Sequence, residues 1–311
     1  MRRFELLTLG TGAALPARGR YPTAQLLNVH EALYLIDCGE GTQERLREQG
    51  VNFMRIERIF ISHLHGDHYL GLQGLISSMH LMGRRSPLFI HGPQPLKAII
   101  DIQLHASGTY LRYPLHVHVN PERSGVPVHA DERMEVTALA LKHRIPTTGF
   151  LFRERPASRG LRQERVAEIP HYFRDKVKQG ADLTLADGTV VPNHDLTLPP
   201  PLPRAYAYCS DTAFAPELVP HLQGVDLLYH EATFTEQLSG RARETLHSTA
   251  AQAATMARDA GVGRLLLGHF SSRYKSEQAL LQEALPIFPR TEAAREGQRY
   301  SVMERKTVDN F

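Results

Sequence analysis

The sequence predicts an α/β fold built in layers, with mixed β-sheets. Short apolar stretches rich in β-branched residues alternate with helical stretches along most of the 311 residues. Some neighbouring strands are joined by hairpins and others by helices, so antiparallel and parallel pairs should occur together. Histidine or aspartate directly follows several predicted strands, and such side chains should meet at one rim of the layers.

The N-terminal half is predicted to begin with a strand at 4–9 and a hairpin that turns near His30-Glu31. Between them, Gly10-Thr11-Gly12 indicates a tight turn that uses the freedom of glycine at positive φ. Pro93 lies near the start of a predicted helix, where its missing N–H has no cost. The strands of this half are 4–9, 25–29, 32–36, 58–61, 87–91, 115–119, 134–141 and 149–152, and the helices are 42–48, 71–82 and 93–107.

The C-terminal half repeats the alternation of strands and helices. Asp187-Gly188 is a strong turn pair and predicts a hairpin over 183–191. Ser248 is placed to cap the alanine-rich helix 250–260. The tail after Pro289 has no informative pattern. The strands of this half are 205–209, 225–229 and 264–267, and its last helix is 276–285.

Composition indicates an ordinary soluble globular protein, with 42% apolar and 22% charged residues. Only two cysteines are present, so no disulfide framework is expected, which fits a cytoplasmic location. No apolar run is long enough to span a bilayer, so no membrane partner is expected. The net charge of +3 and the isoelectric point of about 8.9 permit an anionic partner without requiring one.

The segment from His63 to His68 places four potential metal ligands within six residues. It follows the strand 58–61 and precedes the helix 71–82, so both sides can hold it. Neutral imidazole and carboxylate oxygen both bind Zn²⁺ well. On an extended loop His63 and His65 should point the same way, whereas the adjacent Asp67 and His68 should point apart. That arrangement would suit two neighbouring metals, and the ligand density disfavours a merely solvated loop.

Other residues of ligand type also follow predicted strands. His143, Asp211 and His269 are each a weak signal alone, but together they could complete the site that the first segment begins. Asp37 also follows a strand. We interpret it as a hydrogen-bonding partner of a ligand or as a helix cap, because the other candidate residues already supply enough metal ligands.

A possible acid lies near the last of these residues. His247 stands at the start of the helix 250–260, which is a good position for an acid that faces an anion. Glu231 could orient such a histidine, and a purely structural role for Glu231 remains equally open.

The segment 153–180 departs from the surrounding pattern and has little periodicity. It contains eight Lys and Arg residues and four Asp and Glu residues, a net charge of +4 that exceeds that of the whole chain. Such a segment is expected to contact a phosphate backbone, although a solvated surface loop would have the same charge.

The motif His63-x-His65-x-Asp67-His68 resembles the signature of the metallo-β-lactamase superfamily. Residues across almost the whole chain resemble the ribonuclease Z enzymes, the tRNA 3′-end processing endonucleases. Two short motifs, His230-Glu231-Ala232-Thr233 and His247-Ser248-Thr249, narrow the resemblance to this branch most. The resemblance implies one domain over 1–311, folded as a four-layer αββα sandwich with a protruding basic arm inserted at about 153–180. Family arms, which clamp tRNA away from the active site, often carry a Gly-Pro pair near the tip, where this chain has Ile169-Pro170.

The resemblance also implies two metal ions per subunit. All the candidate ligands offer nitrogen or oxygen, which suits Zn²⁺ and allows Mn²⁺. Two such cations could supply a nucleophile from water and neutralise phosphate charge. The implied ligands are His63, His65 and His143 for one ion, Asp67, His68 and His269 for the other, and Asp211 as the bridge between them.

The expected reaction is cleavage of precursor tRNA directly after the discriminator nucleotide. Asp67 is expected to orient the attacking water or take its proton, and His247 to protonate the leaving 3′-oxygen. The products would be tRNA with a free 3′-OH and a trailer with a 5′-phosphate. The resemblance further implies a homodimer in which the arm of one subunit holds tRNA for the other. The arm residues expected to contact tRNA are Arg155, Arg159, Arg162 and Arg165.

Two other functions stay open at this stage. A metallo-β-lactamase-fold hydrolase acting on small phosphodiesters, lactones or thioesters would carry the same metal motif; the basic segment and the region of His247 favour the tRNA endonuclease. A non-catalytic, metal-stabilised RNA-binding protein is the third alternative. It is disfavoured because a purely structural zinc site is normally closed by four ligands.

Overall fold

The computed structural model describes residues 3–303, and the chain divides into two compact units. The larger unit comprises Met1–Arg153 and Arg204–Phe311, and the smaller one comprises Glu154–Pro203. Within the described residues, no helix combines the length and the apolar character that crossing a bilayer requires.

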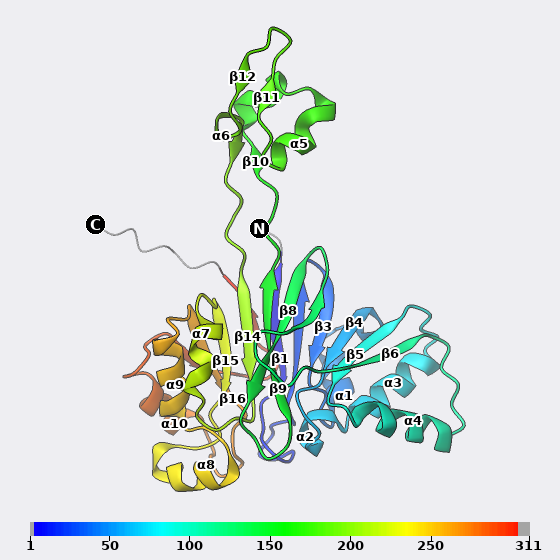
Figure 1. The fold of residues 1–311 in the computed structure, drawn as a ribbon. Coiled ribbons are helices and arrows are strands. Elements are labelled where there is room, and N and C mark those ends of the chain that lie inside the picture. Colours follow the sequence, from blue (N-terminus) through cyan, green and yellow to red (C-terminus); the bar gives the residue numbers. More distant parts are fainter. Residues whose placement is uncertain (1–2, 304–311) are drawn as a thin grey trace. The chain divides into compact units, whose positions relative to one another are not determined.

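The first sheet of the larger unit has seven strands in the order β18-β1-β2-β3-β4-β5-β6 (Figure 1). The pairs from β18 to β3 are antiparallel, and those from β3 to β6 are parallel because helices connect these strands. The predicted turn between β2 and β3 is present, with φ of 50° at His30 and 71° at Glu31. The strands are β1 Phe4–Gly10, β2 Ala24–Val29, β3 Ala32–Ile36, β4 Ile56–Phe60, β5 Leu88–Gly92, β6 Leu115–Val119 and β18 Arg299–Ser301.

The second sheet also has seven strands, in the order β17-β16-β15-β14-β9-β8-β7. The pairs from β14 to β17 are parallel, whereas β9 runs antiparallel to β14 and β7 antiparallel to β8. Both sheets are therefore mixed, as predicted. The strands are β7 Pro127–Ala130, β8 Met134–Leu141, β9 Thr147–Glu154, β14 Ala205–Cys209, β15 Leu227–Glu231, β16 Arg264–Gly268 and β17 Thr291–Ala293.

Helices lie on the outer faces of the two sheets. Figure 1 shows α1, α3 and α4 on the side of the first sheet and α7, α9 and α10 on the side of the second. The α-helices of the larger unit are α1 Thr42–Glu48, α2 Gly66–Tyr69, α3 Leu72–Leu81, α4 Leu96–Ala106, α7 Val219–Leu222, α8 Ser239–Thr245, α9 Ala250–Asp259 and α10 Gln278–Ala284. Short 3₁₀ turns are Phe53–Arg55, Pro216–Leu218 and Glu236–Leu238.

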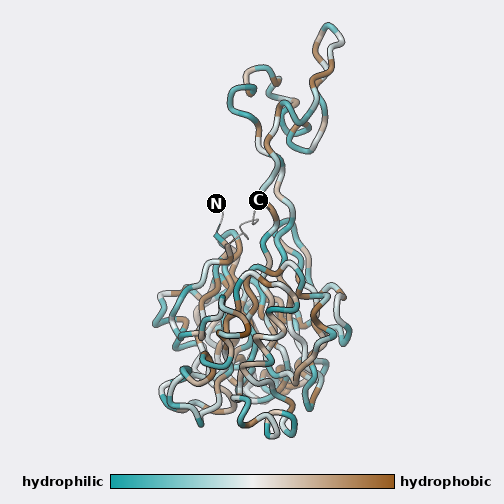
Figure 2. The backbone as a smooth tube through the Cα atoms, turned by 90° about the vertical axis from the view of Figure 1, so that its left-hand side faces the viewer, coloured by the Kyte–Doolittle hydropathy of each residue, from teal (hydrophilic) through white to brown (hydrophobic). Residues whose placement is uncertain are grey.

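Alternating side chains divide the apolar core into three layers. On β3, Leu33 and Leu35 pack toward α1, α3 and α4, whereas Tyr34 and Ile36 pack between the two sheets. On β14, Tyr206 and Tyr208 face the same central layer, and Ala207 faces α9. Because successive strand residues point to opposite faces, each sheet is covered on both sides. The result is the predicted four-layer αββα sandwich, and Figure 2 shows apolar segments concentrated in the interior of the larger unit.

The turn at Gly10 and Gly12 differs from the prediction. Neither residue has positive φ. A Cβ atom on Gly10 would instead lie 1.7 Å from the carbonyl oxygen of Pro22. Close approach of two backbone segments, rather than a left-handed conformation, therefore excludes a side chain at this position.

Two further expectations are corrected near the C-terminus. The tail after Pro289 supplies β17 and β18, which are the edge strands of the two sheets. The N-cap of α9 is Thr249, whose side chain and that of Gln252 form a reciprocal capping box. Ser248 instead donates its hydroxyl to the carbonyl oxygen of Thr212.

The smaller unit has a core of its own, made by Ile169, Val177, Leu183 and Leu196. The predicted hairpin around Asp187-Gly188 is present, with a φ of 84° at Gly188. Its elements are β10 Gly160–Leu161, α5 Arg174–Lys178, β11 Leu183–Thr184, β12 Val190–Val191, α6 Asn193–Leu196 and β13 Thr197–Leu198, with 3₁₀ turns at Gln163–Glu168 and His171–Phe173.

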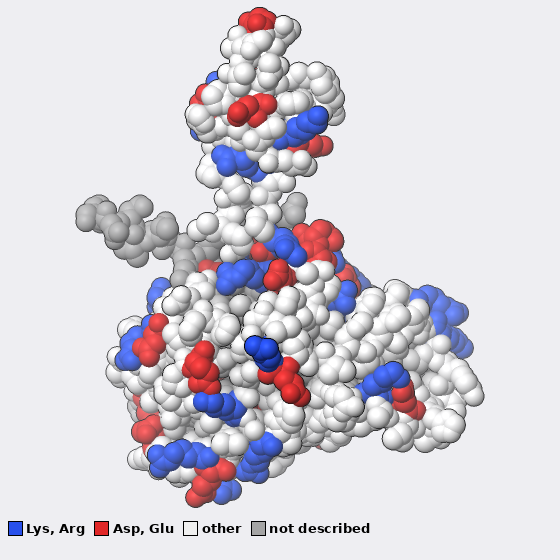
Figure 3. Space-filling model, viewed as in Figure 1, with Lys and Arg blue, Asp and Glu red and all other residues white. Residues whose placement is uncertain are grey.

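The charge of the smaller unit is balanced. The unit extends beyond the segment 153–180 to Pro203, and over Glu154–Pro203 it contains seven Lys and Arg residues and seven Asp and Glu residues. The additional acidic residues are Asp182, Asp187 and Asp195. Figure 3 shows both signs of charge on its visible surface. The basic character inferred from 153–180 therefore does not hold for the compact unit.

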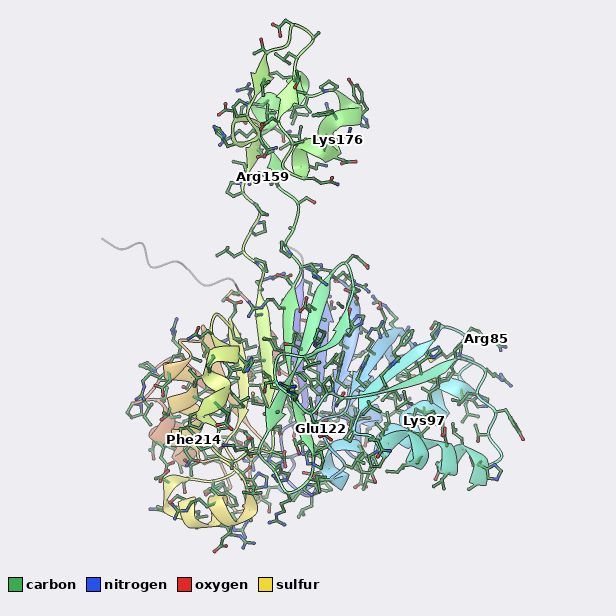
Figure 4. The ribbon with its side chains drawn as sticks, viewed as in Figure 1. Arg85, Lys97, Glu122, Arg159, Lys176 and Phe214 are labelled. Atoms are coloured by element: carbon green, nitrogen blue, oxygen red, sulfur yellow. The ribbon has the colours of Figure 1, made fainter. Side chains whose placement is uncertain are left out.

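Interactions within the smaller unit involve Arg159, Arg162 and Arg165, which are expected to contact tRNA. Arg165 forms an ion pair with Glu168 at 2.6 Å, and Arg162 lies 3.9 Å from Glu164. Arg159, labelled in Figure 4, donates from Nε to the Thr197 hydroxyl at 2.7 Å, which ties the residue before β10 to β13. These side chains contribute to the unit's own structure, whatever else they bind.

Candidate metal centre

Histidine and aspartate side chains converge where strands of both sheets end. His63 follows β4, His143 follows β8, Asp211 follows β14 and His269 follows β16. Asp211 and His269 have positive φ, at 53° and 56°. Residues other than glycine rarely adopt this conformation, and such strain concentrates at functional sites.

The first group of converging side chains contains three histidines and one carboxylate. Nδ1 of His65 lies 3.0 Å from Nε2 of His63 and 3.2 Å from Nε2 of His143. Oδ2 of Asp211 lies 3.7 Å from Nε2 of both His63 and His143. These four residues could hold one metal ion.

The second group contains Asp67, His68 and His269. The Nε2 atoms of the two histidines are 3.4 Å apart, and Oδ2 of Asp67 lies 3.5 Å from each of them. Oδ1 of Asp211 lies 3.0 Å from Nε2 of His68 and 3.1 Å from Nε2 of His269. Asp211 therefore faces both groups, one oxygen toward each.

The expectation that Asp67 and His68 point apart is wrong. They lie in α2, a single helical turn, and not on an extended loop. The helical turn brings both side chains to the second group. The structure thus gathers all seven sequence-predicted ligands into two groups that share Asp211, while their role as ligands stays a prediction.

Four histidines of the centre, His63, His68, His143 and His269, have the other ring nitrogen held by a hydrogen-bonding partner. His68 contacts Asp37 at 2.7 Å, and His269 contacts the Thr233 hydroxyl at 2.9 Å. His63 contacts the Ser62 hydroxyl at 3.0 Å, and His143 the carbonyl oxygen of Leu246 at 3.0 Å. Such partners fix ring orientation and tautomer in metal sites. Asp37 therefore has the hydrogen-bonding role that the sequence suggested.

The protonation states of three histidines and two carboxylates suit a cation. Burial lowers the pKa of His63, His65 and His143, so these rings are neutral and have a free lone pair. Although burial opposes the ionised form, neighbouring histidines hold the pKa of Asp67 and of Asp211 well below the usual range. His68 differs, because the carboxylates of Asp211, Asp67 and Asp37 raise its pKa well above the ordinary value although burial opposes the charged form, so a bound cation would have to displace its proton. The neutral imidazoles and ionised carboxylates of the other residues are a donor set that fits divalent metals.

His247 lies beside the second group and contacts Glu231. Its ring stacks on that of His269 with centroids 5.4 Å apart, and its Nδ1 lies 2.8 Å from Oε1 of Glu231. Although burial opposes the charged form, Glu231 raises the pKa of His247 to about 9. His247 is therefore protonated at neutral pH and can donate a proton. Both roles left open for Glu231 have geometric support, because Glu231 contacts His247 and also accepts hydrogen bonds from the Thr212 backbone N–H at 2.7 Å and the Thr233 hydroxyl at 2.6 Å.

A cleft of about 730 Å³ opens over the two groups. Asp67, His143 and His247 line it, and the guanidinium groups of Arg144, Arg241 and Arg273 bring positive charge to the same cleft. A phosphate-containing substrate would meet favourable charge on entering.

Sequence reasoning missed several residues that support the centre. Thr233 lies within the His230–Thr233 motif, so that motif was an available signal, and Ser62 immediately precedes His63. Leu246 left no signal in the sequence. Leu246 acts through its carbonyl oxygen in a left-handed conformation with a φ of 56°, which is an unusual conformation for leucine.

The fold and the site define a metallo-β-lactamase-fold protein with a candidate two-metal centre. Among solved structures, the short form of human tRNase Z is similar with a TM-score of 0.70 and 28% identity, covering 96% of this chain and 99% of that chain. The metallo-β-lactamase fold protein YhfI from Bacillus subtilis has a TM-score of 0.68 and 18% identity, covering 96% and 99%. The family described as anti-Pycsar protein Apyc1 matches residues 4–152.

Proteins with similar sequences identify the family within this fold. Ribonuclease Z of Phocaeicola vulgatus is 45% identical over 304 residues, which cover 97% of this chain and 98% of the relative. Ribonuclease Z of Bacteroides fragilis is 46% identical, covering 95% and 98%, and that of Porphyromonas gingivalis is 44% identical, covering 96% and 99%. The chain belongs to the ribonuclease Z family.

Replacing Glu231 by glutamine should lower the pKa of His247 from about 9 toward the ordinary histidine value of about 6.5. The reason is that the substitution removes the carboxylate that stabilises the imidazolium but keeps an acceptor for Nδ1. NMR titration of the His247 ring in metal-free protein would measure the shift. Glu217→Gln, which affects an ion pair with Lys142 and not the centre, is the matched control. An unchanged pKa in Glu231→Gln would refute the electrostatic assignment.

Proposed function

We propose that this ribonuclease Z family member is a zinc-dependent endoribonuclease that cuts precursor tRNA after the discriminator nucleotide. The proposal is supported above all by Asp211, whose two oxygens face two separate groups of ligand-type side chains at 3.0–3.7 Å. Family membership makes the protein a hydrolase and an endoribonuclease. The convergence at Asp211 supplies the physical basis for hydrolysing a phosphodiester with two metal ions.

The clustering of the side chains supports a proposal for the residues that would hold the metals. His63, His65 and His143 would bind one ion, Asp67, His68 and His269 the other, and Asp211 would bridge them. Bound divalent ions would lower the pKa of water and neutralise charge on the phosphate. The mixed nitrogen and oxygen donors suit Zn²⁺ and allow Mn²⁺.

Asp67 and His247 would perform the proton transfers. Oδ2 of Asp67 accepts a hydrogen bond from the backbone N–H of Ala14 at 2.7 Å, which fixes the carboxylate at the floor of the cleft. There it can orient the attacking water and take its proton. His247, protonated through Glu231, is placed to give a proton to the 3′-oxygen as its bond to phosphorus breaks. The products are tRNA with a 3′-OH and a trailer with a 5′-phosphate.

The smaller unit would act as the tRNA-binding arm. Because its net charge is zero, general attraction to the phosphate backbone is a weak basis for binding, and local surfaces must provide the contacts. Arg155, Arg159, Arg162 and Arg165 remain the proposed contact residues. Remote binding of this kind selects tRNA-shaped substrates without changing the chemistry at the phosphate.

We propose that the protein forms a homodimer and that it is located in the cytoplasm. The dimer rests on the family resemblance. The location is supported by two buried cysteines that form no disulfide, as expected in a reducing compartment. Fractionation of cells, with detection of the protein in each fraction, checks the location, and its recovery outside the cytoplasm would contradict it.

Cleavage of a precursor tRNA with a 3′ trailer, with the product ends mapped, tests the function directly. We expect a single cut after the discriminator that is abolished by a chelator and restored by Zn²⁺ or Mn²⁺. Asp67→Ala should abolish cleavage but leave tRNA binding intact, because the arm provides affinity at a distance. Absence of the cut, together with hydrolysis of a small phosphodiester by the same preparation, would contradict the tRNA substrate and retain the metal centre.

Subunit complementation tests the arm and the dimer together. Arg153 pairs with Ala205 in the antiparallel β9–β14 pair, so the arm can be replaced by a short Asn-Gly turn between Glu154 and Arg204. This variant should keep small-phosphodiester hydrolysis but lose tRNA cleavage. Mixing it with Asp67→Ala subunits should restore tRNA cleavage, since one subunit then supplies an arm and the other an active site. Loss of both activities in the arm variant would make the arm structural, and failure to complement would contradict the shared-arm dimer.

A further inference from the structure

The buried carboxylate of Asp37 connects the metal centre to the opposite sheet. Its Oδ1 accepts the backbone N–H of Ser62 at 2.7 Å. Its Oδ2 lies 2.7 Å from Nδ1 of His68, 2.8 Å from the Ser62 hydroxyl and 2.6 Å from the Tyr208 hydroxyl. Asp37 follows β3 of the first sheet, whereas Tyr208 lies on β14 of the second.

Tyr208 is held rigidly at this position. Its side chain is fully buried, and its ring stacks on Tyr229 with centroids 5.3 Å apart and an interplanar angle of 15°. The hydroxyl therefore has little freedom to leave the carboxylate. Tyr208 is also three residues before Asp211, so β14 carries both a residue that faces the two ligand groups and one that reaches His68 indirectly.

Three hydrogen-bond donors contact Oδ2 of Asp37, and each restricts the rotation of the carboxylate. The carboxylate in turn sets the orientation of the His68 ring and increases the electron density at Nε2, the atom that faces Asp67, Asp211 and His269. Removing the Tyr208 hydroxyl would free one lone pair of a buried carboxylate and allow it to turn. The orientation of His68 would then be less well defined.

We propose that Tyr208 is a positioning residue that acts through Asp37 and His68 to raise the affinity of the second ligand group for a divalent cation. The proposal rests on the metal-binding part of the proposed function. It assigns no contact between Tyr208 and substrate or metal. The largest effect is expected at the group of Asp67, His68 and His269, because Asp37 contacts His68 directly. It reaches His63 of the first group only through the Ser62 hydroxyl.

Tyr206 provides a matched control on the same strand. It is also fully buried, and its hydroxyl donates to Oε1 of Gln25. Gln25 lies on β2 and is not one of the residues of the two ligand groups. Tyr206→Phe and Tyr208→Phe each remove one buried hydroxyl that makes a hydrogen bond, but only Tyr208→Phe changes the surroundings of a candidate ligand.

The test measures Zn²⁺ affinity by competition with a chromophoric chelator, in a His65→Ala, His143→Ala background that disables the first group. We expect Tyr208→Phe to weaken binding about tenfold, the lower end of the range for partners outside the ligand set. Tyr206→Phe should leave the affinity unchanged. Thermal unfolding of the metal-free proteins should show losses of similar size for both, since each loses one buried hydrogen bond.

An unchanged affinity in Tyr208→Phe, or equal losses in the two variants, would overturn the proposal. If Tyr208→Phe fails to fold, Asp37→Asn tests the same connection, because asparagine tolerates the φ of 55° at this position and keeps the side-chain shape. Its affinity loss should exceed tenfold, and an unchanged affinity there would equally overturn the proposal. Failure of the proposed function is distinguishable, because it would show as absent Zn²⁺ binding in the unsubstituted protein.

Discussion

The burial of the Asp211 carboxylate is the constraint on which the rest of the centre depends. Asp211 is 2% exposed and its carboxylate lies among ring nitrogens of His63, His68, His143 and His269. An ionised group in such a place is costly unless positive charge is close by. Two divalent cations, one at each oxygen, would supply that charge. The strands that precede these residues belong to both sheets, and the four-layer architecture places the ends of these strands at the same rim.

The surrounding backbone is fixed by tertiary contacts more than by local preference. Asp37, Asp211, Leu246 and His269 all have φ between 53° and 56°, a region that residues other than glycine seldom occupy. Such conformations persist only where the neighbouring structure determines them. Here hydrogen bonds do so: Asp37 holds His68, Thr233 holds His269, and the Leu246 carbonyl oxygen holds His143. The same network reaches His247 through Glu231, so proton donation and ligand geometry share one support.

Much of this could be predicted because ligand types directly follow apolar strands, and parallel strands end at a common edge. That local rule placed His63, His143, Asp211 and His269 correctly in the fold. It also placed Asp67 and His68 at the site, but the expectation that these two side chains point apart was wrong, because both lie in the helical turn α2. The rule failed for β17 and β18, whose short sequences become strands only by pairing with the sheet edges. The net charge of 153–180 gave a wrong estimate of the charge of the smaller unit, because the unit extends beyond that segment. The additional residues include Leu183 and Leu196, which complete its core, and three acidic residues.

The central claim is that Asp211 lies between two metal ions. Anomalous diffraction at the zinc absorption edge, from crystals grown with Zn²⁺, tests this most directly because it locates each ion independently of activity. The account predicts two peaks, one at the group of His63, His65 and His143 and one at the group of Asp67, His68 and His269. A single peak enclosed by four protein ligands would contradict the account and indicate a structural zinc site.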